Sequence, residues 1–439
     1  MVPLPTRPAA LATLALALAA PSAHAAVELV VATVNNPQMI EMQKLSKQFE
    51  QAHPDITLKW VTLEEGALRQ KVSLDIAQQG GQFDVVTIGM YETPIWGRKG
   101  WLREIQADER YNLKDVLPTV RAGLSVGKAL YAAPFYGESS MTIYRTDLFE
   151  QAGLSMSNRP TWADIRTAAQ KLHDPKNGRY GVCLRGKPGW GDNMALLSTM
   201  VNTWGGQWFG MDWKPQIDAK PWQEAVSFYV DLLKNYGPPG AAAHSFNENL
   251  QLFAQGRCAI WVDATAAGTA LSDPRLSKVT AQTGFALAPT AVTPKGASWL
   301  WAWALAIPAT SRQADAAQRF VRWATSEDYL SLVGRTAGWA ALPSGTRYST
   351  YRRPEFRQAA RFAMIEAVSI AMADPNAATL QPAPYTGVQF ASIPEFQSIG
   401  QHTGQQISAA LVGQLSVGQA LANAQTQAEQ VMRQAGYMK

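Results

Sequence analysis

The chain has 439 residues, of which 47% are hydrophobic and 17% charged, and its formal net charge at pH 7 is +5. This length is enough for two domains with substantial cores. The basic residues are scattered and form no run, which excludes the concentrated positive patch of a nucleic-acid-binding protein.

The first 25 residues are predicted to be a secretory signal peptide. Arg7 precedes an apolar run over residues 9–20, and small residues flank His24 near the end of the segment. The run is shorter than the ~20 residues that a membrane-spanning helix needs. No cysteine follows it to carry a lipid anchor. We therefore expect cleavage after Ala25 and a mature protein in the periplasm or outside the cell.

The chain after residue 25 begins with alternating strands and helices. Short apolar or alternating segments predict strands, and amphipathic segments predict helices, the first opening at Pro37 with Asn36 as its N-cap. The predicted strands are 27–34, 56–61 and 83–89, and the helices between them are 37–52 and 66–81. This βαβαβ order predicts an α/β fold with a parallel sheet covered on both faces.

Further helices follow downstream. Thr161 and Asp164 have the spacing of a capping box at the start of one helix, and Ser311 is the predicted N-cap of another. The predicted helices are 161–172, 221–237, 247–256 and 311–329, and a strand covers 258–263.

Two cysteines remain in the mature chain, Cys183 and Cys258, and each lies in an apolar, strand-like segment. In an oxidising compartment such a pair forms either one disulfide or two buried thiols. The sequence gives no distance between them and leaves both alternatives open.

Enzyme motifs are nearly absent from the sequence. Residues 123–127 match G-x-S-x-G, but a strand follows the motif, whereas a nucleophile elbow requires a helix there, so we interpret the segment as a turn. The histidines are dispersed and lack metal-binding spacing. No P-loop or dinucleotide fingerprint is present. We therefore expect no catalysis, no cofactor and no metal, although paired carboxylates of a glycosidase would leave no sequence signature.

The chain is rich in tryptophan, with 15 residues, many of them at the ends of predicted elements or in glycine-rich loops. An indole combines a large apolar face with an N–H donor, which suits the C–H faces and hydroxyls of a sugar or polyol. Three indoles alternate in SWLWAWALAIP, and we expect one or two of them to face a cleft and the rest to pack in the core. The candidate ligand-contacting tryptophans are Trp190, Trp204, Trp299, Trp301, Trp303 and Trp339.

Polar residues gather where predicted strands end. In an open parallel sheet, ligands bind outside the carboxyl ends of the strands. Carboxylates accept hydrogen bonds from hydroxyls and arginine donates several, so this set favours a polyhydroxylated ligand. The polar candidates are Asn35, Asn36, Gln38, Glu92, Glu138, Ser139, Arg185, Asn193 and Asp263.

From end to end, the mature chain resembles the periplasmic solute-binding proteins of ABC importers. The segments that carry the resemblance include VELVVATVNNPQM, YAAPFYGESSMTIYRTDLFEQAG, YGVCLRGKPGWGDN, SWLWAWALAIPATS and GVQFASIPEFQSIG. Within the large sugar-binding group, YGESSMTIYRTDLF and WLWAWALAIP are most similar to the sorbitol- and mannitol-binding members. The resemblance implies a two-lobed Venus-flytrap fold with a ligand cleft between the lobes.

The resemblance also implies how the parts are arranged. The first lobe is expected to comprise 26–136 plus 290–340, and the second lobe 137–289 plus 341–439. Glu138 matches the carboxylate of the strand that crosses between lobes. Asn35 and Asn36 match the loop after the first strand, and Trp301 and Trp303 match the aromatic strand.

The expected function is reversible capture of a sugar alcohol by a periplasmic monomer that delivers it to a membrane permease. The alternatives are a binder of a monosaccharide or oligosaccharide, a binder of another solute such as a metal chelate, and a secreted carbohydrate-active enzyme.

Overall fold

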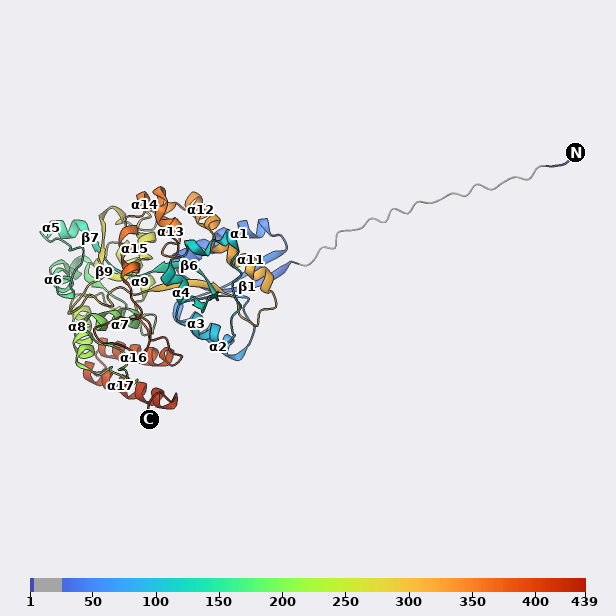
Figure 1. The fold of residues 1–439 in the computed structure, drawn as a ribbon. Coiled ribbons are helices and arrows are strands. Elements are labelled where there is room, and N and C mark those ends of the chain that lie inside the picture. Colours follow the sequence, from blue (N-terminus) through green and yellow to red (C-terminus); the bar gives the residue numbers. More distant parts are fainter. Residues whose placement is uncertain (4–25) are drawn as a thin grey trace.

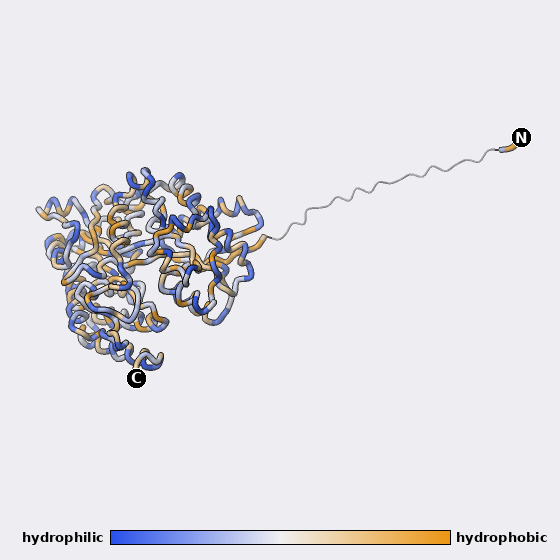
Figure 2. The backbone as a smooth tube through the Cα atoms, in the orientation of Figure 1, coloured by the Kyte–Doolittle hydropathy of each residue, from blue (hydrophilic) through white to orange (hydrophobic). Residues whose placement is uncertain are grey.

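The computed structural model describes residues 1–3 and 26–439. The predicted signal peptide lies almost entirely outside these residues. The chain forms two lobes, each built on its own β-sheet, as the ribbon of Figure 1 shows. Hydrophobic stretches run through the interior of both lobes, and hydrophilic stretches predominate on the outer turns (Figure 2).

The first lobe contains a five-stranded sheet. Its order is β2-β1-β3-β11-β6, in which β1 is parallel to β2 and β3, whereas β11 is antiparallel to both of its neighbours. Its strands are β1 (Val27–Val34), β2 (Ile56–Leu63), β3 (Val85–Ile88), β6 (Ala132–Glu138) and β11 (Trp301–Ala306). The parallel β1–β3 half agrees with the predicted βαβαβ unit.

Helices cover this sheet. Around the first lobe lie α1 (Pro37–Ala52), α2 (Glu65–Gln78), α3 (Glu92–Arg98), α4 (Pro118–Gly123), α11 (Ala314–Ala324), α12 (Glu327–Thr336), α13 (Tyr348–Arg352) and α14 (Pro354–Ala359). A small hairpin of β4 (Ser125–Val126) and β5 (Ala129–Leu130) follows α4. The predicted turn in the G-x-S-x-G segment is therefore confirmed, since Gly127 joins the two hairpin strands with φ of 60°.

The second lobe contains a four-stranded sheet of order β10-β7-β9-β8, in which only β8 and β9 run parallel. Its strands are β7 (Ser140–Arg145), β8 (Tyr180–Cys183), β9 (Cys258–Ala264) and β10 (Thr283–Leu287). Its helices are α5 (Thr146–Gln151), α6 (Trp162–Leu172), α7 (Asn193–Thr203), α8 (Lys220–Tyr236), α9 (Phe246–Ala254), α10 (Ala267–Leu271), α15 (Ala363–Met372), α16 (Phe396–Leu411) and α17 (Val417–Gln434). The C-terminal helices α16 and α17 pack against each other and against α8 (Figure 1).

The local signals succeeded at some helix ends and failed at others. Thr161 and Asp164 form the predicted capping box of α6. Asn36 occupies the N-cap position of α1, but its side chain makes no capping bond, because its Nδ2 donates to the Tyr136 hydroxyl at 2.8 Å. The single helix predicted from Ser311 was wrong. The chain forms α11 and α12 instead, because the Ser326 hydroxyl accepts from the Tyr329 amide and starts a new helix.

The predicted lobe boundary at residue 340 falls inside a segment that continues to contact the first lobe. The Gly137 amide donates to the Ser344 carbonyl at 2.8 Å, and the Arg347 guanidinium donates to the Tyr111 carbonyl at 3.1 Å. α15 then packs against β7 and β10 of the second lobe. We propose that the return segment of the first lobe extends to Arg353, while the other predicted boundaries stay predictions.

Two further features bear on the setting of the protein. Cys183 and Cys258 form a disulfide that joins β8 to β9. Within residues 1–3 and 26–439, no helix is both long and apolar enough to cross a membrane.

Candidate functional site

A small cavity lies where the two lobes meet, and we call it the inner cavity. It contains about 330 Å³ of space not occupied by atoms. Only about 30 Å³ of this space can hold the centre of a water molecule, so the walls pack closely against each other in this form. Its lining residues are Glu65, Arg69, Glu138, Arg185, Trp190, Gly191, Ala195, Trp299, Trp301, Trp303 and Gln389.

Glu138 ends strand β6, at the point where the chain crosses from the first sheet to the second. Its side chain is buried, with 8% of the residue exposed, and no residue within 26–439 donates a hydrogen bond to its carboxyl group. Burial raises the pKa of Glu138 to about 8, and the opposing effect of the Arg185 charge is smaller. A buried carboxyl group without a partner is unfavourable unless something else bonds to it.

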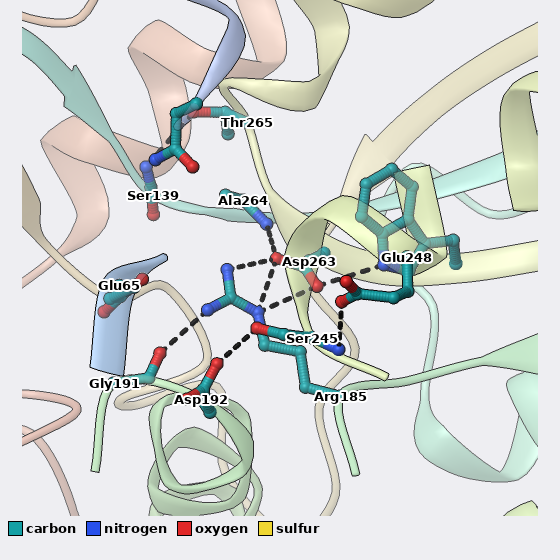
Figure 3. Close-up of polar contacts among 12 residues, drawn as sticks. Glu65, Ser139, Arg185, Gly191, Asp192, Ser245, Glu248, Asp263, Ala264 and Thr265 are labelled. Carbon is teal, nitrogen blue, oxygen red and sulfur yellow. Dashed lines mark hydrogen bonds and ion pairs between the residues drawn. The ribbon is translucent and has the colours of Figure 1, made fainter. Parts of the chain in front are cut away.

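Arg185 follows β8 and is held in place by residues of its own lobe. Its Nη2 donates to Asp263 at 2.6 Å, its Nε donates to the same carboxylate at 3.0 Å, and its Nη1 donates to the Gly191 carbonyl at 2.8 Å (Figure 3). Trp261 Nε1 also donates to Asp263 at 3.0 Å. The guanidinium is therefore fixed before any ligand arrives.

Three indoles from one segment form the aromatic wall of the inner cavity. We predicted that one or two of Trp299, Trp301 and Trp303 would face the cleft, but all three line it. Trp301 lies over Gly89, where an added Cβ would come within 1.9 Å of its ring. The Nε1 atoms of Trp299 and Trp301 are buried and have no hydrogen-bond partner among the described residues. They are unsatisfied donors on residues that line the inner cavity.

Arg69, on α2, is a residue that the sequence analysis missed. Its guanidinium carbon lies 4.1 Å from the ring centre of Trp190, 4.9 Å from that of Trp301 and 4.8 Å from that of Trp303. Glu65 and Glu92 neutralise it through ion pairs. Burial alone would lower the pKa of Arg69, but the two carboxylates raise it overall, so the group is charged. Because Trp190 belongs to the second lobe, this stack spans the cleft.

The other predicted site residues lie outside the inner cavity. Some support its walls: Glu92 binds Arg69, and Asp263 binds Arg185. Asn193 donates to the Gly404 carbonyl, and Ser139 occupies the crossing between lobes, with its hydroxyl buried and unpartnered within the described chain.

Asn35 and Gln38 also miss the inner cavity, although both reach the second lobe. Asn35 accepts a hydrogen bond from Asn247 at 3.2 Å, and Gln38 donates to the Ala266 carbonyl at 3.2 Å. Asn36 is bound to Tyr136 within the first lobe.

Two predicted tryptophans lie far from the inner cavity. Trp204 packs against Trp162 and Phe228 in the second lobe. Trp339 covers Gly334, where an added Cβ would come within 2.3 Å of its ring. Both fill packing space, as most indoles do.

The residues that were missed had weak signals. Glu65 and Arg69 have the i, i+4 spacing of a helical ion pair, which is ordinarily a surface feature. Gln389 lies in a segment without regular structure, and its amide bonds the Leu300 carbonyl beside the aromatic wall at 2.8 Å. In the described part of the chain, no group of three or more His, Cys, Asp or Glu side chains could hold a metal ion.

Comparison with known proteins agrees with this architecture. Residues 36–330 match the model of a family described as bacterial extracellular solute-binding protein. The chain is 54% identical over 418 residues to a mannitol-binding protein of Pseudomonas aeruginosa, covering 95% of this chain and 96% of the relative.

Solved structures give the same result. A solute-binding protein of an ABC transporter from Agrobacterium vitis S4, crystallised with bound D-mannitol, is 54% identical, with a TM-score of 0.93 over 94% of this chain and 100% of the other. A second, from Agrobacterium radiobacter K84 in complex with ribitol, has a TM-score of 0.81 at 24% identity over 92% and 98% of the two chains, which supports the fold. The chain therefore belongs to the family of bacterial extracellular solute-binding proteins.

Proposed function

We propose that the protein captures a hexitol such as D-mannitol in the inner cavity and releases it to the permease of an ABC importer. One observation carries the proposal: Glu138 is a buried carboxyl group that accepts no hydrogen bond from residues 26–439, in a cavity lined by indoles between two lobes. The 54% identity to a mannitol-binding protein and to a structure with bound D-mannitol supports the choice of ligand.

The chemistry of the cavity matches an open-chain polyol. Glu138 accepts hydrogen bonds from hydroxyl groups, and the free indole N–H groups of Trp299 and Trp301 donate to hydroxyl oxygens. The indole faces pack against the C–H groups of the carbon chain. Each buried hydrogen bond to a hydroxyl contributes about 0.5–1.5 kcal/mol.

Capture requires that the lobes open and close. In the structure, several contacts cross between the lobes, among them the Lys187–Glu64 ion pair and the bond from the Tyr91 hydroxyl to the Ile393 carbonyl. Because these contacts hold the lobes together, the ligand enters a more open form and stabilises the closed one by its own contacts.

The setting of this activity follows from the family. Extracellular solute-binding proteins act outside the cytoplasm, and we propose the periplasm as the location, with the signal peptide removed after Ala25. We further propose that the protein acts as a monomer and has no catalytic activity. Incubation with D-mannitol, sorbitol and oligosaccharides, followed by NMR, tests the last point, and any product would contradict it.

The binding proposal is tested by calorimetric titration of the purified protein with D-mannitol, sorbitol, glucose and maltose. We expect the tightest binding with a hexitol. Preferred binding of glucose or maltose, with no response to hexitols, would replace the polyol by a sugar.

A variant assigns the binding to the inner cavity. Glu138→Ala should weaken D-mannitol binding by roughly tenfold or more, because at least one buried hydrogen bond is lost and a ligand hydroxyl is left without its partner. Glu355→Ala, which changes an exposed glutamate on α14, is the matched control and should bind as the wild type does. Unchanged affinity of Glu138→Ala would remove Glu138 from the site.

A further inference from the structure

A close contact between the lobes lies where the inner cavity adjoins a larger groove. We propose that Glu65 and Gly191 form a septum that limits the ligand to about the length of one hexitol and excludes polyols that carry a glycosyl group. This inference rests on the proposed function and adds an upper limit on ligand length.

The groove beyond the septum, which we call the outer groove, encloses about 1490 Å³, part of it open to solvent. It shares four lining residues with the inner cavity: Glu65, Arg69, Trp190 and Gly191. The two spaces are therefore neighbours that have these four residues as common walls.

The septum is a close contact between the lobes. A Cβ added to Gly191 would lie 2.2 Å from Glu65 Oε1, so only a residue without a side chain lets the two approach this closely. Figure 3 shows Glu65 beside Gly191, with Arg185 bonded to the Gly191 carbonyl.

Both sides of the septum are held rigidly. Glu65 Oε1 accepts hydrogen bonds from Arg69 Nε at 3.0 Å and from Arg69 Nη2 at 2.9 Å. Gly191 is held by Arg185, which Asp263 fixes in turn. A ligand that protruded from the inner cavity would have to separate Glu65 from Gly191, and the lobes could then not close as they do here.

The outer groove has the chemistry to hold a sugar once the septum is gone. Gln397, Gln401 and Gln405 recur at four-residue spacing along α16 and line one side of it. Gln70 and Lys187 also line the groove. These amides and the ammonium group donate to hydroxyls, so what excludes a glycosyl unit is the septum and not a lack of polar partners.

Titration of the wild-type protein with alditols of increasing length tests the proposed limit on ligand length. Titration with a tetritol, a pentitol, D-mannitol, a heptitol and maltitol should give the tightest binding at the hexitol and at least roughly tenfold weaker binding of maltitol. Comparable affinity for D-mannitol and maltitol would overturn the septum while leaving the proposed function intact. A wild type that binds no alditol at all would instead contradict the proposed function.

A variant of Glu65 then tests whether this residue limits the length of the ligand. Glu65→Ala removes one side of the septum and should raise the ratio of maltitol to D-mannitol affinity at least roughly tenfold over that of the wild type. Gln70→Ala, which changes only the outer groove, is the control and should leave the ratio as in the wild type. An unchanged ratio in Glu65→Ala would overturn the septum. Loss of both ligands would assign Glu65 to hexitol binding and would overturn it as well.

Discussion

The two halves of the inner cavity are built in different ways. In the second lobe, Arg185 and Asp263 are bonded to each other and to neighbours of the same lobe, and the disulfide joins β8, which precedes Arg185, to β9, which contains Asp263. In the first lobe, Arg69 depends on Trp190 from across the cleft for one face of its stack. The second lobe therefore offers a finished polar surface, whereas the first lobe completes its aromatic surface only when the lobes meet.

The largest expected effect on stability tests the Arg185–Asp263 pair of the second lobe. Arg185→Ala leaves the buried Asp263 without its counter-ion and should lower the free energy of unfolding by about 3–5 kcal/mol, measured by urea denaturation. Arg433→Ala, which removes an exposed ion pair with Glu429 on α17, should change it by less than about 1 kcal/mol. Similar small values for both variants would mean that the Arg185 pair does not hold the second lobe together.

The hinge between the halves contains a second buried acid, Glu366 on α15. Tyr351 donates to it at 2.7 Å and Thr265 at 3.1 Å, so it links the return segment of the first lobe to the end of β9. Burial raises the pKa of Glu366 from 4.5 to about 7. Because the pKa in the folded state is the higher one, the stabilisation is complete below about pH 4.5 and is lost as the pH rises to about 7.

Glu366→Gln should abolish that pH dependence, which amounts to a difference on the order of 3 kcal/mol between wild type and variant over this pH range. Urea denaturation at a series of pH values measures it, with the exposed Glu355→Gln as the control. Parallel pH profiles of wild type and Glu366→Gln would show that Glu366 does not titrate in the hinge.

The disulfide is expected to stabilise the second lobe. Cys183 and Cys258 are 75 residues apart in the sequence. Replacing both with serine should lower the free energy of unfolding by at least about 2 kcal/mol, because the unfolded chain gains conformational freedom. The loss should disappear when wild type and variant are both denatured under reducing conditions. A loss of stability that persists under reducing conditions would show that it arises from altered packing and not from loss of the cross-link.

The smallest expected effect is on ligand affinity and tests an ion pair that forms only when the lobes meet. Lys187→Met removes an ion pair with Glu64 that crosses the cleft and is partly exposed. D-mannitol binding should weaken by less than about fivefold, and the difference should shrink at high salt. Lys44→Met, whose partner Glu41 lies on the same helix, should leave binding unchanged. A salt-independent loss in Lys187→Met would indicate a packing effect.

Much of the fold could be predicted because its signals are local. The alternation of β1, α1, β2, α2 and β3 is encoded in apolar periodicity, and the α6 capping box is encoded by two residues three positions apart. The break between α11 and α12 was missed because the competing cap, Ser326, lies within an otherwise continuous helical pattern.

The site was less predictable than the fold, because residues that meet across the two lobes are far apart in the sequence and follow no regular spacing. Glu138 and Arg185 were predicted from their position at strand ends, and the three indoles from their alternation along one strand; all five line the inner cavity. Arg69 was not predicted, because its partners Glu92 and Trp190 are distant in the sequence. Trp204 and Trp339 are the same residue type as the indoles that line the inner cavity and differ from them only in what surrounds them.

The position of Glu138 has a mechanical consequence. It is the residue directly before Ser139, whose carbonyl accepts from the Thr265 amide at 2.7 Å and whose amide donates to the Thr265 hydroxyl at 3.2 Å. The group proposed to touch the ligand is thus one peptide unit from the pivot about which the lobes would turn. A ligand that bonds to Glu138 would therefore act directly on the segment that connects the lobes. No chain of intermediate residues would be needed to couple ligand binding to rotation of the lobes.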